Sequence, residues 1–166
     1  LANSAVVFNF KESHFNLVRP GISLYGVEDK RLKPVMSLKA KVHLVKKLPK
    51  GHSVSYGRNF VLPKDGFVAV LPIGYGHGYP YSLTGKSGAR VLIGGKSYPV
   101  SGNVCMDYTL IFLGEKTDIQ TGDEAVLIGE QGSESITASE LANLTGTIPY
   151  EIMTRMSHEI ERWHAE

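Results

Sequence analysis

The clearest pattern along the chain is the alternation of apolar and polar residues between Met36 and Leu44, which predicts a half-buried β-strand. Pro49-Lys50-Gly51 then predicts a turn. Further apolar runs recur at short intervals and predict strands over residues 67–72, 89–93, 96–100, 108–113 and 124–128. Gly94-Gly95 between two of these runs is a hairpin signal. Strands at such short spacing favour a mainly β domain, built as a sandwich or a partly open barrel.

Helical signals come late in the sequence and are short. Thr137 and Glu140 have the spacing of a capping box, and Gly146 marks the end of the helix that they begin. A second helical piece is expected over residues 149–160, because proline fits the first turn of a helix and apolar residues follow it on one face. The C-terminal region therefore predicts two short helices after the strands.

Residues 1–30 have a different pattern from the rest of the chain. Within them, residues 21–27 read as a short strand, and the region is too short to build a core of its own. The charged stretch 28–31 follows and is expected to be solvated. We therefore place a domain boundary here, with residues 1–30 as one part and residues 31–166 as the mainly β domain.

Composition narrows the classes of function. The 166 residues are 42% hydrophobic and 20% charged, which is ordinary for a globular protein and argues against intrinsic disorder. A formal net charge of +2 gives no reason to expect a nucleic acid or a membrane surface as partner. No apolar run reaches the roughly 18 residues of a membrane-spanning helix. The lone cysteine, Cys105, cannot form an internal disulfide, so we expect a reducing compartment, the cytoplasm.

Residues 74–80, with the sequence GYGHGYP, break the strand pattern directly after a buried apolar run. Glycines let a backbone approach a partner closely, and Tyr75 between two of them could shuttle a proton if a neighbouring cation activated its phenol. A glycine-rich turn with two packing tyrosines is the alternative. His77 has no second ligand at a recognisable metal spacing, so we expect a structural or solvated histidine and no metal site.

Two other segments hold candidate groups. The backbone N–H groups of Gly21 and Ile22 could hold an anion together with the Ser4 hydroxyl. Arg19, next to them, is by itself equally consistent with a solvated residue or with the partner of a carboxylate. Cys105 would need an activating base to act as a nucleophile, and the sequence shows none, so we expect a small buried residue there.

Taken together, in order and in spacing, these segments closely resemble the C-terminal part of bacterial alanine racemase. The resemblance extends over nearly the whole chain, although no single motif would be specific alone. It rests on the motifs NSA at 3–5, VRPGISLYG at 18–26, SYG at 55–57, GYGHGYP at 74–80, CMD at 105–107 and PYE at 149–151.

The resemblance implies an enzyme of two domains. The first is a (β/α)8 barrel that carries pyridoxal phosphate on a lysine, and the second is mainly β. Residues 1–30 would then be the last piece of the barrel, expected to be irregular without the rest of it, and residues 31–166 the β domain. The cofactor lysine would lie outside this sequence, so we expect the 166-residue chain alone to be inactive.

Roles for individual residues follow from the same resemblance. Tyr75 matches one of the two bases of the racemase, which one subunit supplies to the barrel of the other, and this implies a homodimer. Arg19 matches the arginine that faces the pyridine nitrogen of the cofactor. Met106 matches the residue whose backbone N–H meets the substrate carboxylate. The family's phosphate contacts correspond to Ser4, Gly21, Ile22 and Tyr150.

The implied function is the interconversion of L- and D-alanine by an isomerase that supplies D-alanine for peptidoglycan. His77 stands where many members carry aspartate, and Asn103 stands where many carry an arginine near the substrate entrance, so serine or a broader range of amino acids is the alternative substrate. A pyridoxal-phosphate decarboxylase of the same architecture is less similar, because its cysteine–aspartate segment differs and it lacks a loop like residues 74–80. The alternative outside the enzymes is a non-catalytic β domain that binds a partner.

Overall fold

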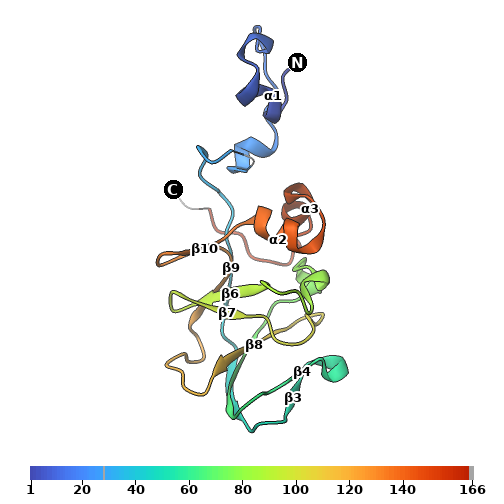
Figure 1. Cartoon of the computed structure of the whole chain (residues 1–166). Helices are drawn as coiled ribbons and strands as arrows, with labels where there is room; N and C mark the ends of the chain where they lie inside the picture. Colours follow the sequence, from blue (N-terminus) through green and yellow to red (C-terminus); the bar gives the residue numbers. More distant parts are fainter. Residues whose placement is uncertain (28, 165–166) are drawn as a thin grey trace.

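Figure 1 shows an elongated molecule in which a short N-terminal segment stands apart from a body of β-strands and short helices. This computed structural model describes residues 1–27 and 29–164. In that part of the chain, ten strands form three antiparallel sheets. The prediction of a mainly β domain with short C-terminal helices is confirmed, and the sheets do not close into a barrel. No helix in the described residues is long and apolar enough to cross a membrane.

The two larger sheets contain most of the strands. The first has the order β1-β9-β6-β7, with β10 also paired to β9, and its strands are β1 (Leu38–Lys41), β6 (Arg90–Ile93), β7 (Lys96–Pro99), β9 (Glu124–Gln131) and β10 (Glu134–Ile136). The second has the order β2-β5-β8, and its strands are β2 (Leu44–Leu48), β5 (Gly66–Leu71) and β8 (Thr109–Gly114). A small ribbon pairs β3 (Ser53–Val54) with β4 (Phe60–Val61). An isolated bridge between Val100 and Ile111 connects β8 to the segment that follows β7.

The β6–β7 hairpin forms as the sequence predicts. Gly94 and Gly95 have φ angles of +59° and +72°, and both central residues of a tight type I′ turn need such positive values. Ile93 pairs with Lys96 directly across this turn. The two glycines therefore fix the register of the hairpin locally, without help from distant contacts.

The strand expected from residue 36 to residue 44 is instead divided between the two larger sheets. The N–H of Val42 donates to the carbonyl oxygen of Asp123 at 2.8 Å, just before β9. The N–H of the next residue, His43, donates to Val70 in β5 at 2.9 Å. The chain thus crosses from one sheet to the other here, because each backbone amide finds an acceptor in a different sheet.

One hydrophobic core joins the two larger sheets to the C-terminal helices. The strands contribute Val91, Ile111 and Leu127, which have no exposed surface. Leu141 and Ile152 reach the same core from the helices and are likewise buried. Removal of this apolar surface from water is the main force that holds the helices on the sheets.

Helix α2 (Ala138–Thr145) begins and ends as the sequence predicts. The Thr137 hydroxyl oxygen accepts the N–H of Glu140 at 3.0 Å, which satisfies one of the free amides of the first turn. Gly146 ends the helix with a φ of +72°.

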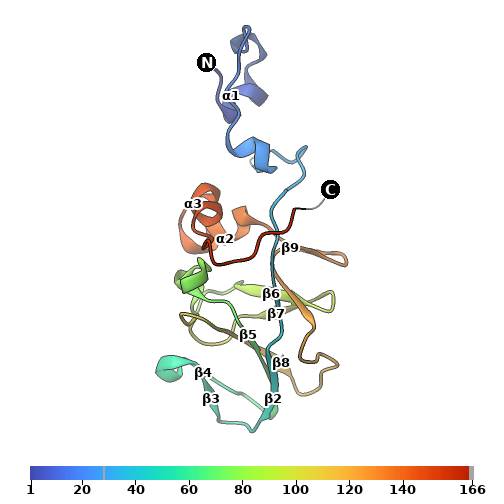
Figure 2. The same ribbon diagram turned by 180° about the vertical axis from the view of Figure 1, so that it is seen from behind.

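Helix α3 (Pro149–Thr154) is shorter than the helix expected over residues 149–160. The N–H of Ser157 donates to the carbonyl oxygen of His77 at 3.1 Å, so the chain leaves the helix to contact the loop that follows β5. Figures 1 and 2 show α2 and α3 at the end of the sheets nearest the N-terminal segment.

Arg90 ties α2 to the strands. Its Nε and Nη2 atoms donate to the two carboxylate oxygens of Glu140 at 2.9 and 3.2 Å. Nη2 also donates to the Ser135 carbonyl oxygen at 2.8 Å, and Nη1 donates to Glu134 at 3.3 Å. Because the side chain is only 25% exposed, solvent screens these contacts less than it screens a surface ion pair.

We expect Arg90→Met to lower the free energy of unfolding by about 1–2 kcal/mol, because charge-assisted, two-pronged hydrogen bonds outweigh exposed ion pairs. Arg90→Lys should recover only part of this loss, since an ammonium group cannot reproduce the planar fork. Urea unfolding measures the difference. Lys39→Met, which removes an exposed pair with Glu124, is the control, and an equal effect of both methionine variants would contradict this role of Arg90.

The N-terminal segment is a small helical unit. It contains α1 (Ser4–Asn9) and two short 3-10 helices, η1 (Lys11–Ser13) and η2 (Ile22–Tyr25). Ala2 and Val18, on the two sides of α1 in sequence, form a parallel bridge, and the N–H of Arg19 donates to the Ala2 carbonyl oxygen at 2.7 Å. The chain therefore returns beside its own start.

The strand expected over residues 21–27 is wrong, because this segment forms η2. The Ser4 hydroxyl oxygen accepts the N–H of Gly21 at 2.8 Å and the N–H of Ser23 at 3.3 Å. These amides turn toward α1 and away from any neighbouring strand. Residues 1–30 are expected to be irregular without the rest of the barrel. The described residues of this segment are instead ordered by these contacts.

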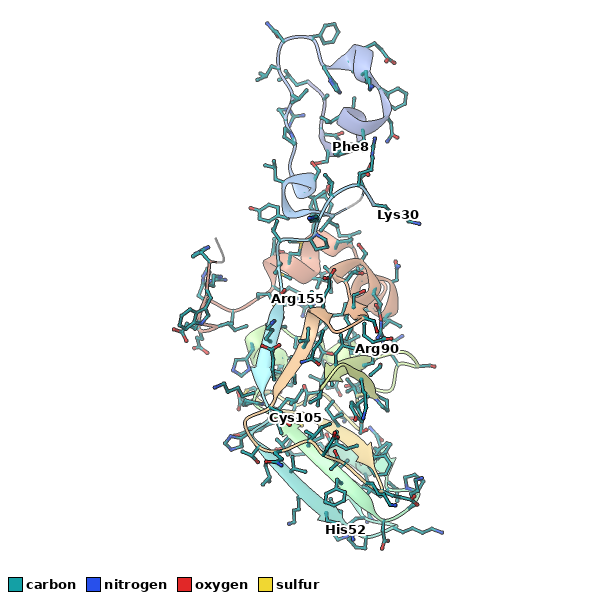
Figure 3. The ribbon with its side chains drawn as sticks, turned by 90° about the vertical axis from the view of Figure 1, so that its left-hand side faces the viewer. Phe8, Lys30, His52, Arg90, Cys105 and Arg155 are labelled. Carbon is teal, nitrogen blue, oxygen red and sulfur yellow. The ribbon has the colours of Figure 1, made fainter. Side chains whose placement is uncertain are left out.

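The connection between the N-terminal segment and β1 is charged and exposed (Figure 3). Arg31 pairs with Asp29 at 2.6 Å, and its guanidinium carbon lies 5.1 Å from the ring centre of Phe8. Hydrogen bonds from Arg31 lower the pKa of the Asp29 carboxyl to about 2. Glu28, in the charged stretch of the sequence, lies outside the described residues. The division between residues 1–30 and 31–166 stays a prediction.

Candidate active site

Tyr75 lies in the short 3-10 helix η4 (Tyr75–His77), directly after β5. Its N–H donates to the carbonyl oxygen of Cys105 at 3.0 Å, and the N–H of Gly76 donates to that of Met106 at 2.9 Å. The glycine-rich loop and the CMD segment, 30 residues apart in sequence, are thereby paired through their backbones. Two predicted site residues, Tyr75 and Met106, are brought together.

The side chain of Tyr75 faces the surface. It is 45% exposed, and its ring packs edge-to-face on Tyr81 with 5.9 Å between the ring centres. Met106 is also exposed, and its backbone N–H has no acceptor in the part of the chain that the structure describes. A phenol and a free backbone donor therefore face outward from adjacent segments, where a small carboxylate could meet both.

Tyr79 differs from Tyr75, although both belong to the same loop. Its side chain is buried, and within the described residues its hydroxyl has no hydrogen-bond partner. Burial, and secondarily the negative charge of Glu140, raise the pKa of the Tyr79 phenol far above its usual range. Tyr79 consequently keeps its proton and is a packing residue, so Tyr75 is the tyrosine of this loop that can exchange a proton with a ligand.

Glycines allow the loop to lie between two backbones. A Cβ atom at Gly74 would overlap the carbonyl oxygens of Cys105 and Met106. A Cβ atom at Gly78, whose φ is +92°, would overlap the carbonyl oxygen of Arg155 at the end of α3. Close backbone approach on both sides explains why the sequence has small residues here.

Thr109 is a site residue that sequence reasoning missed. Its hydroxyl is fully buried and donates to the carbonyl oxygen of Ile73 at 2.7 Å, at the point where β5 ends and the loop begins. In the sequence, Thr109 is only one inward position of an alternating strand, and no local signal distinguishes it.

Ser55, in the motif SYG at 55–57, supports the backbone just before the CMD segment. Ser55 has a φ of +65°, and its hydroxyl donates to the carbonyl oxygen of Asn103 at 2.8 Å. The Asn103 amide oxygen in turn accepts a hydrogen bond from Asn59 at 2.7 Å. Cys105 is half-buried, not fully buried as expected, and its sulfur lies 3.4 Å from the Ser55 hydroxyl oxygen.

His77 is half-buried and makes a specific contact, which fits the structural role expected for it. Its Nδ1 atom accepts the N–H of Gly74 at 3.2 Å. Across the described residues, no group of three or more His, Cys, Asp or Glu side chains is arranged to hold a metal ion.

The predicted anion-binding residues meet in the N-terminal segment. Ser4 is buried, and its hydroxyl lies within hydrogen-bond distance of the Gly21 amide and of both the amide and the hydroxyl of Ser23. The N–H of Ile22 has no acceptor among the described residues. The Ser4 hydroxyl and the Ile22 N–H are left to donate to the oxygens of a phosphate group, whereas the Gly21 and Ser23 amides donate to the Ser4 oxygen in this structure. Ser23 joins this group without having been predicted.

Arg19 lies beside this group, directly after the parallel bridge between Ala2 and Val18. Its guanidinium is exposed and reaches the carbonyl oxygen of Leu1 at 3.4 Å. No carboxylate pairs with it in the described part of the chain, so its charge is available to a ligand.

Tyr150 lies in α3 and is 41% exposed. Its neighbour Glu151 accepts hydrogen bonds from Thr147 and Arg155, which together lower the pKa of the Glu151 carboxyl. Glu151 thereby connects Thr147, before α3, to Arg155, directly after it.

The site residues thus form two groups within one chain. Ser4, Gly21, Ile22 and Arg19 lie in the protruding N-terminal segment, whereas Tyr75 and Met106 lie in the β domain (Figures 1 and 2). Residues 35–164, which hold the second group, match the family model described as alanine racemase, C-terminal domain.

The chain belongs to the alanine racemase C-terminal domain family. It is 46% identical to the alanine racemase of Carboxydothermus hydrogenoformans over 169 aligned positions, which cover 97% of this chain and 45% of that protein. It is also 46% identical to the alanine racemase of Thermodesulfovibrio yellowstonii, with coverage of 98% and 44%. The chain therefore spans less than half the length of these curated alanine racemases.

This chain has the fold of the matching part of solved alanine racemases. The enzyme from Streptomyces lavendulae superimposes with a TM-score of 0.91 at 36% identity, covering 99% of this chain and 45% of that one. The enzyme from Bacillus anthracis with bound L-Ala-P superimposes with a TM-score of 0.86 at 37% identity, covering 94% and 42%. At 99% coverage, the match to the Streptomyces lavendulae enzyme includes the N-terminal segment as well as the β domain.

Proposed function

We propose that this chain is part of a pyridoxal-phosphate-dependent racemase that interconverts L- and D-alanine, with Tyr75 as one of its two bases. The observation that carries the proposal is the pairing of the 74–78 loop with residues 105–106. This pairing presents the exposed Tyr75 phenol beside the free backbone N–H of Met106. Removal of the α-proton of a small amino acid requires a base, placed next to a hydrogen-bond donor that binds the carboxylate of the substrate.

The donor set of the N-terminal segment fits the phosphate group of the cofactor. Ser4 and Ile22 would donate to the phosphate oxygens, and Gly21 would do so once its N–H exchanges the bond that it makes to Ser4 here. Tyr150 would be a further contact, and Arg19 would face the ring nitrogen. When bound, pyridoxal phosphate supplies an electron sink that makes the α-proton of an amino acid removable.

Arg19 would limit the strength of that sink. A guanidinium group stays charged at all accessible pH values, so a ring nitrogen facing it tends to remain without a proton. By keeping the ring nitrogen unprotonated, Arg19 would disfavour side reactions such as transamination.

Tyr75 would act on the cofactor site of a second subunit. The separation of Tyr75 from the Ser4 group within one chain supports this arrangement, which gives a homodimer with two shared active sites. The half-buried, unpaired thiol of Cys105 is compatible with a cytoplasmic location.

The experiment that tests the proposal is racemisation of alanine by the product of the complete gene with pyridoxal phosphate added. We expect activity on both enantiomers and a cofactor absorbance band. A cofactor band without activity on alanine would move the substrate to serine or another amino acid. The absence of both would favour a binding domain instead of an enzyme.

A further inference from the structure

The ring of His77 closes the turn that carries Tyr75. Nδ1 of His77 accepts the N–H of Gly74 at 3.2 Å, and the N–H of His77 donates back to the carbonyl oxygen of Gly74 at 3.0 Å. Both peptide groups of Gly74 are thus engaged by the residue three positions later, in the manner of a helix capping box. Tyr75 lies between the two ends of this closed turn.

The direction of the Tyr75 side chain depends on this backbone more than on its own packing. The residues on either side of Tyr75 are glycines, which have no side chains to restrict the backbone. The phenol is 45% exposed and packs edge-to-face on Tyr81. In the described structure, the hydrogen bond to the His77 ring is the side-chain contact that ties one end of the turn to the other.

His77 also connects the turn to the C-terminal region. Its carbonyl oxygen accepts the N–H of Ser157, in the segment after α3. The carbonyl oxygen of Arg155 lies so close to Gly78 that a Cβ atom there would overlap it. The backbone of His77 is therefore fixed by the segment after α3, while its ring bonds to the first residue of the turn.

We propose that His77 is a positioning residue for Tyr75, whose ring, by accepting the Gly74 N–H, fixes the position of the phenol. The proposal rests on the proposed function, in which Tyr75 moves the α-proton. The ring acts through an unprotonated Nδ1, because a nitrogen that accepts this bond has no proton of its own. The histidine touches no reacting atom.

The test compares two substitutions in the complete, cofactor-loaded protein. His77→Leu keeps the bulk and removes the acceptor, whereas His77→Asn places an amide oxygen on Cγ, where Nδ1 is attached. Since a displacement of about 1 Å at a reacting group can cost roughly 100-fold, we expect kcat of His77→Leu to fall about 10- to 100-fold. KM should change much less, and His77→Asn should recover most of the lost kcat.

The matched control is His52→Leu, because His52 is exposed and lies at the opposite end of the molecule from the N-terminal segment (Figure 3). It should leave kcat and KM at wild-type values. If His77→Leu does not fold, His77→Gln replaces it: its acceptor lies one bond further from the backbone, so it should remain slower than His77→Asn.

Exchange of the α-proton in D2O separates positioning from general destabilisation. His77→Leu should slow the exchange of one enantiomer more than that of the other, in the same sense as Tyr75→Phe. Equal slowing of both enantiomers, or a His77→Asn variant as slow as His77→Leu, would overturn the proposal. If Tyr75→Phe shows the asymmetry and His77→Leu is like wild type, this inference alone fails; if Tyr75→Phe shows none, the proposed role of Tyr75 fails.

Discussion

Tyr75→Phe in the complete protein is expected to lower racemisation about a thousandfold, within the range that a positioned acid–base group contributes. The substitution removes one oxygen atom and keeps the ring, so the edge-to-face contact with Tyr81 remains. The backbone bond from residue 75 to the Cys105 carbonyl oxygen is also unaffected. Folding and cofactor binding should therefore be unchanged, and the loss should fall on proton transfer.

The informative measurement is exchange of the α-proton with D2O from each enantiomer separately. With one base on each face of the substrate, loss of the Tyr75 hydroxyl should slow exchange from one enantiomer far more than from the other. Some loss of net racemisation in both directions is expected, because both bases act in every turnover. Equal loss of exchange from both enantiomers would argue against the assignment.

Two tyrosines of the same region serve as controls. Tyr81→Phe removes a neighbouring exposed hydroxyl, and Tyr79→Phe removes a buried hydroxyl that has no partner in the described structure. Neither should change the ratio of the two exchange rates. Tyr79→Phe should also unfold at the same or a higher temperature, since an unsatisfied buried polar group costs free energy.

The parts of the fold that the sequence predicts well are those with local causes. Gly94 and Gly95 set the β6–β7 hairpin through their own backbone conformation. Thr137 and Gly146 set the ends of α2 by a side-chain cap and a left-handed residue. In each case the residues that decide the structure lie within a few positions of the element that they define.

The sequence-based predictions are wrong where a hydrogen-bond partner that is distant in the sequence sets the backbone conformation. Residues 42 and 43 separate two strands because Asp123 and Val70, in different sheets, accept their amides. The segment 21–27 is helical because the Ser4 hydroxyl, 17 residues before Gly21, accepts two of its amides. Periodicity alone contains no information about such partners, and tertiary contacts override weak local preferences.

The candidate site shows the same division. Tyr75 and Met106 are identified from motifs, but nothing in the sequence places them in hydrogen-bonded neighbouring segments. Thr109 and Ser55 support those segments through single hydroxyl groups, 36 and 48 positions from their acceptors. Supporting residues of this kind have ordinary surroundings in the sequence, so only the three-dimensional structure distinguishes them.

Gly74→Ala is expected to destabilise the protein by about 3 kcal/mol and to lower racemisation at least as much as a displaced base would. Gly74 has φ −154° and ψ −161°, an extended conformation that alanine adopts without strain. The cost is therefore steric: the new methyl group would overlap the carbonyl oxygens of Cys105 and Met106, which are backbone atoms and cannot rotate away.

Gly95→Ala is the opposite case and provides the control. Gly95 has a positive φ of +72°, but a Cβ atom there would meet no atom within 4 Å. A left-handed alanine costs about 1–2 kcal/mol without any clash, and the hairpin turn contains no predicted site residue. Gly95→Ala should therefore lower the unfolding temperature modestly and leave kcat unchanged.

Comparing Gly74→Ala with Gly95→Ala tests whether the loop depends on close backbone approach at Gly74. If close backbone approach holds Tyr75 in place, Gly74→Ala should separate the 74–76 segment from residues 105–106, so that stability and kcat fall together. Thermal unfolding and steady-state kinetics on the two variants measure this directly. A Gly74→Ala protein as stable and as active as Gly95→Ala would show that the two segments can move apart without cost, and that the phenol is held by other contacts.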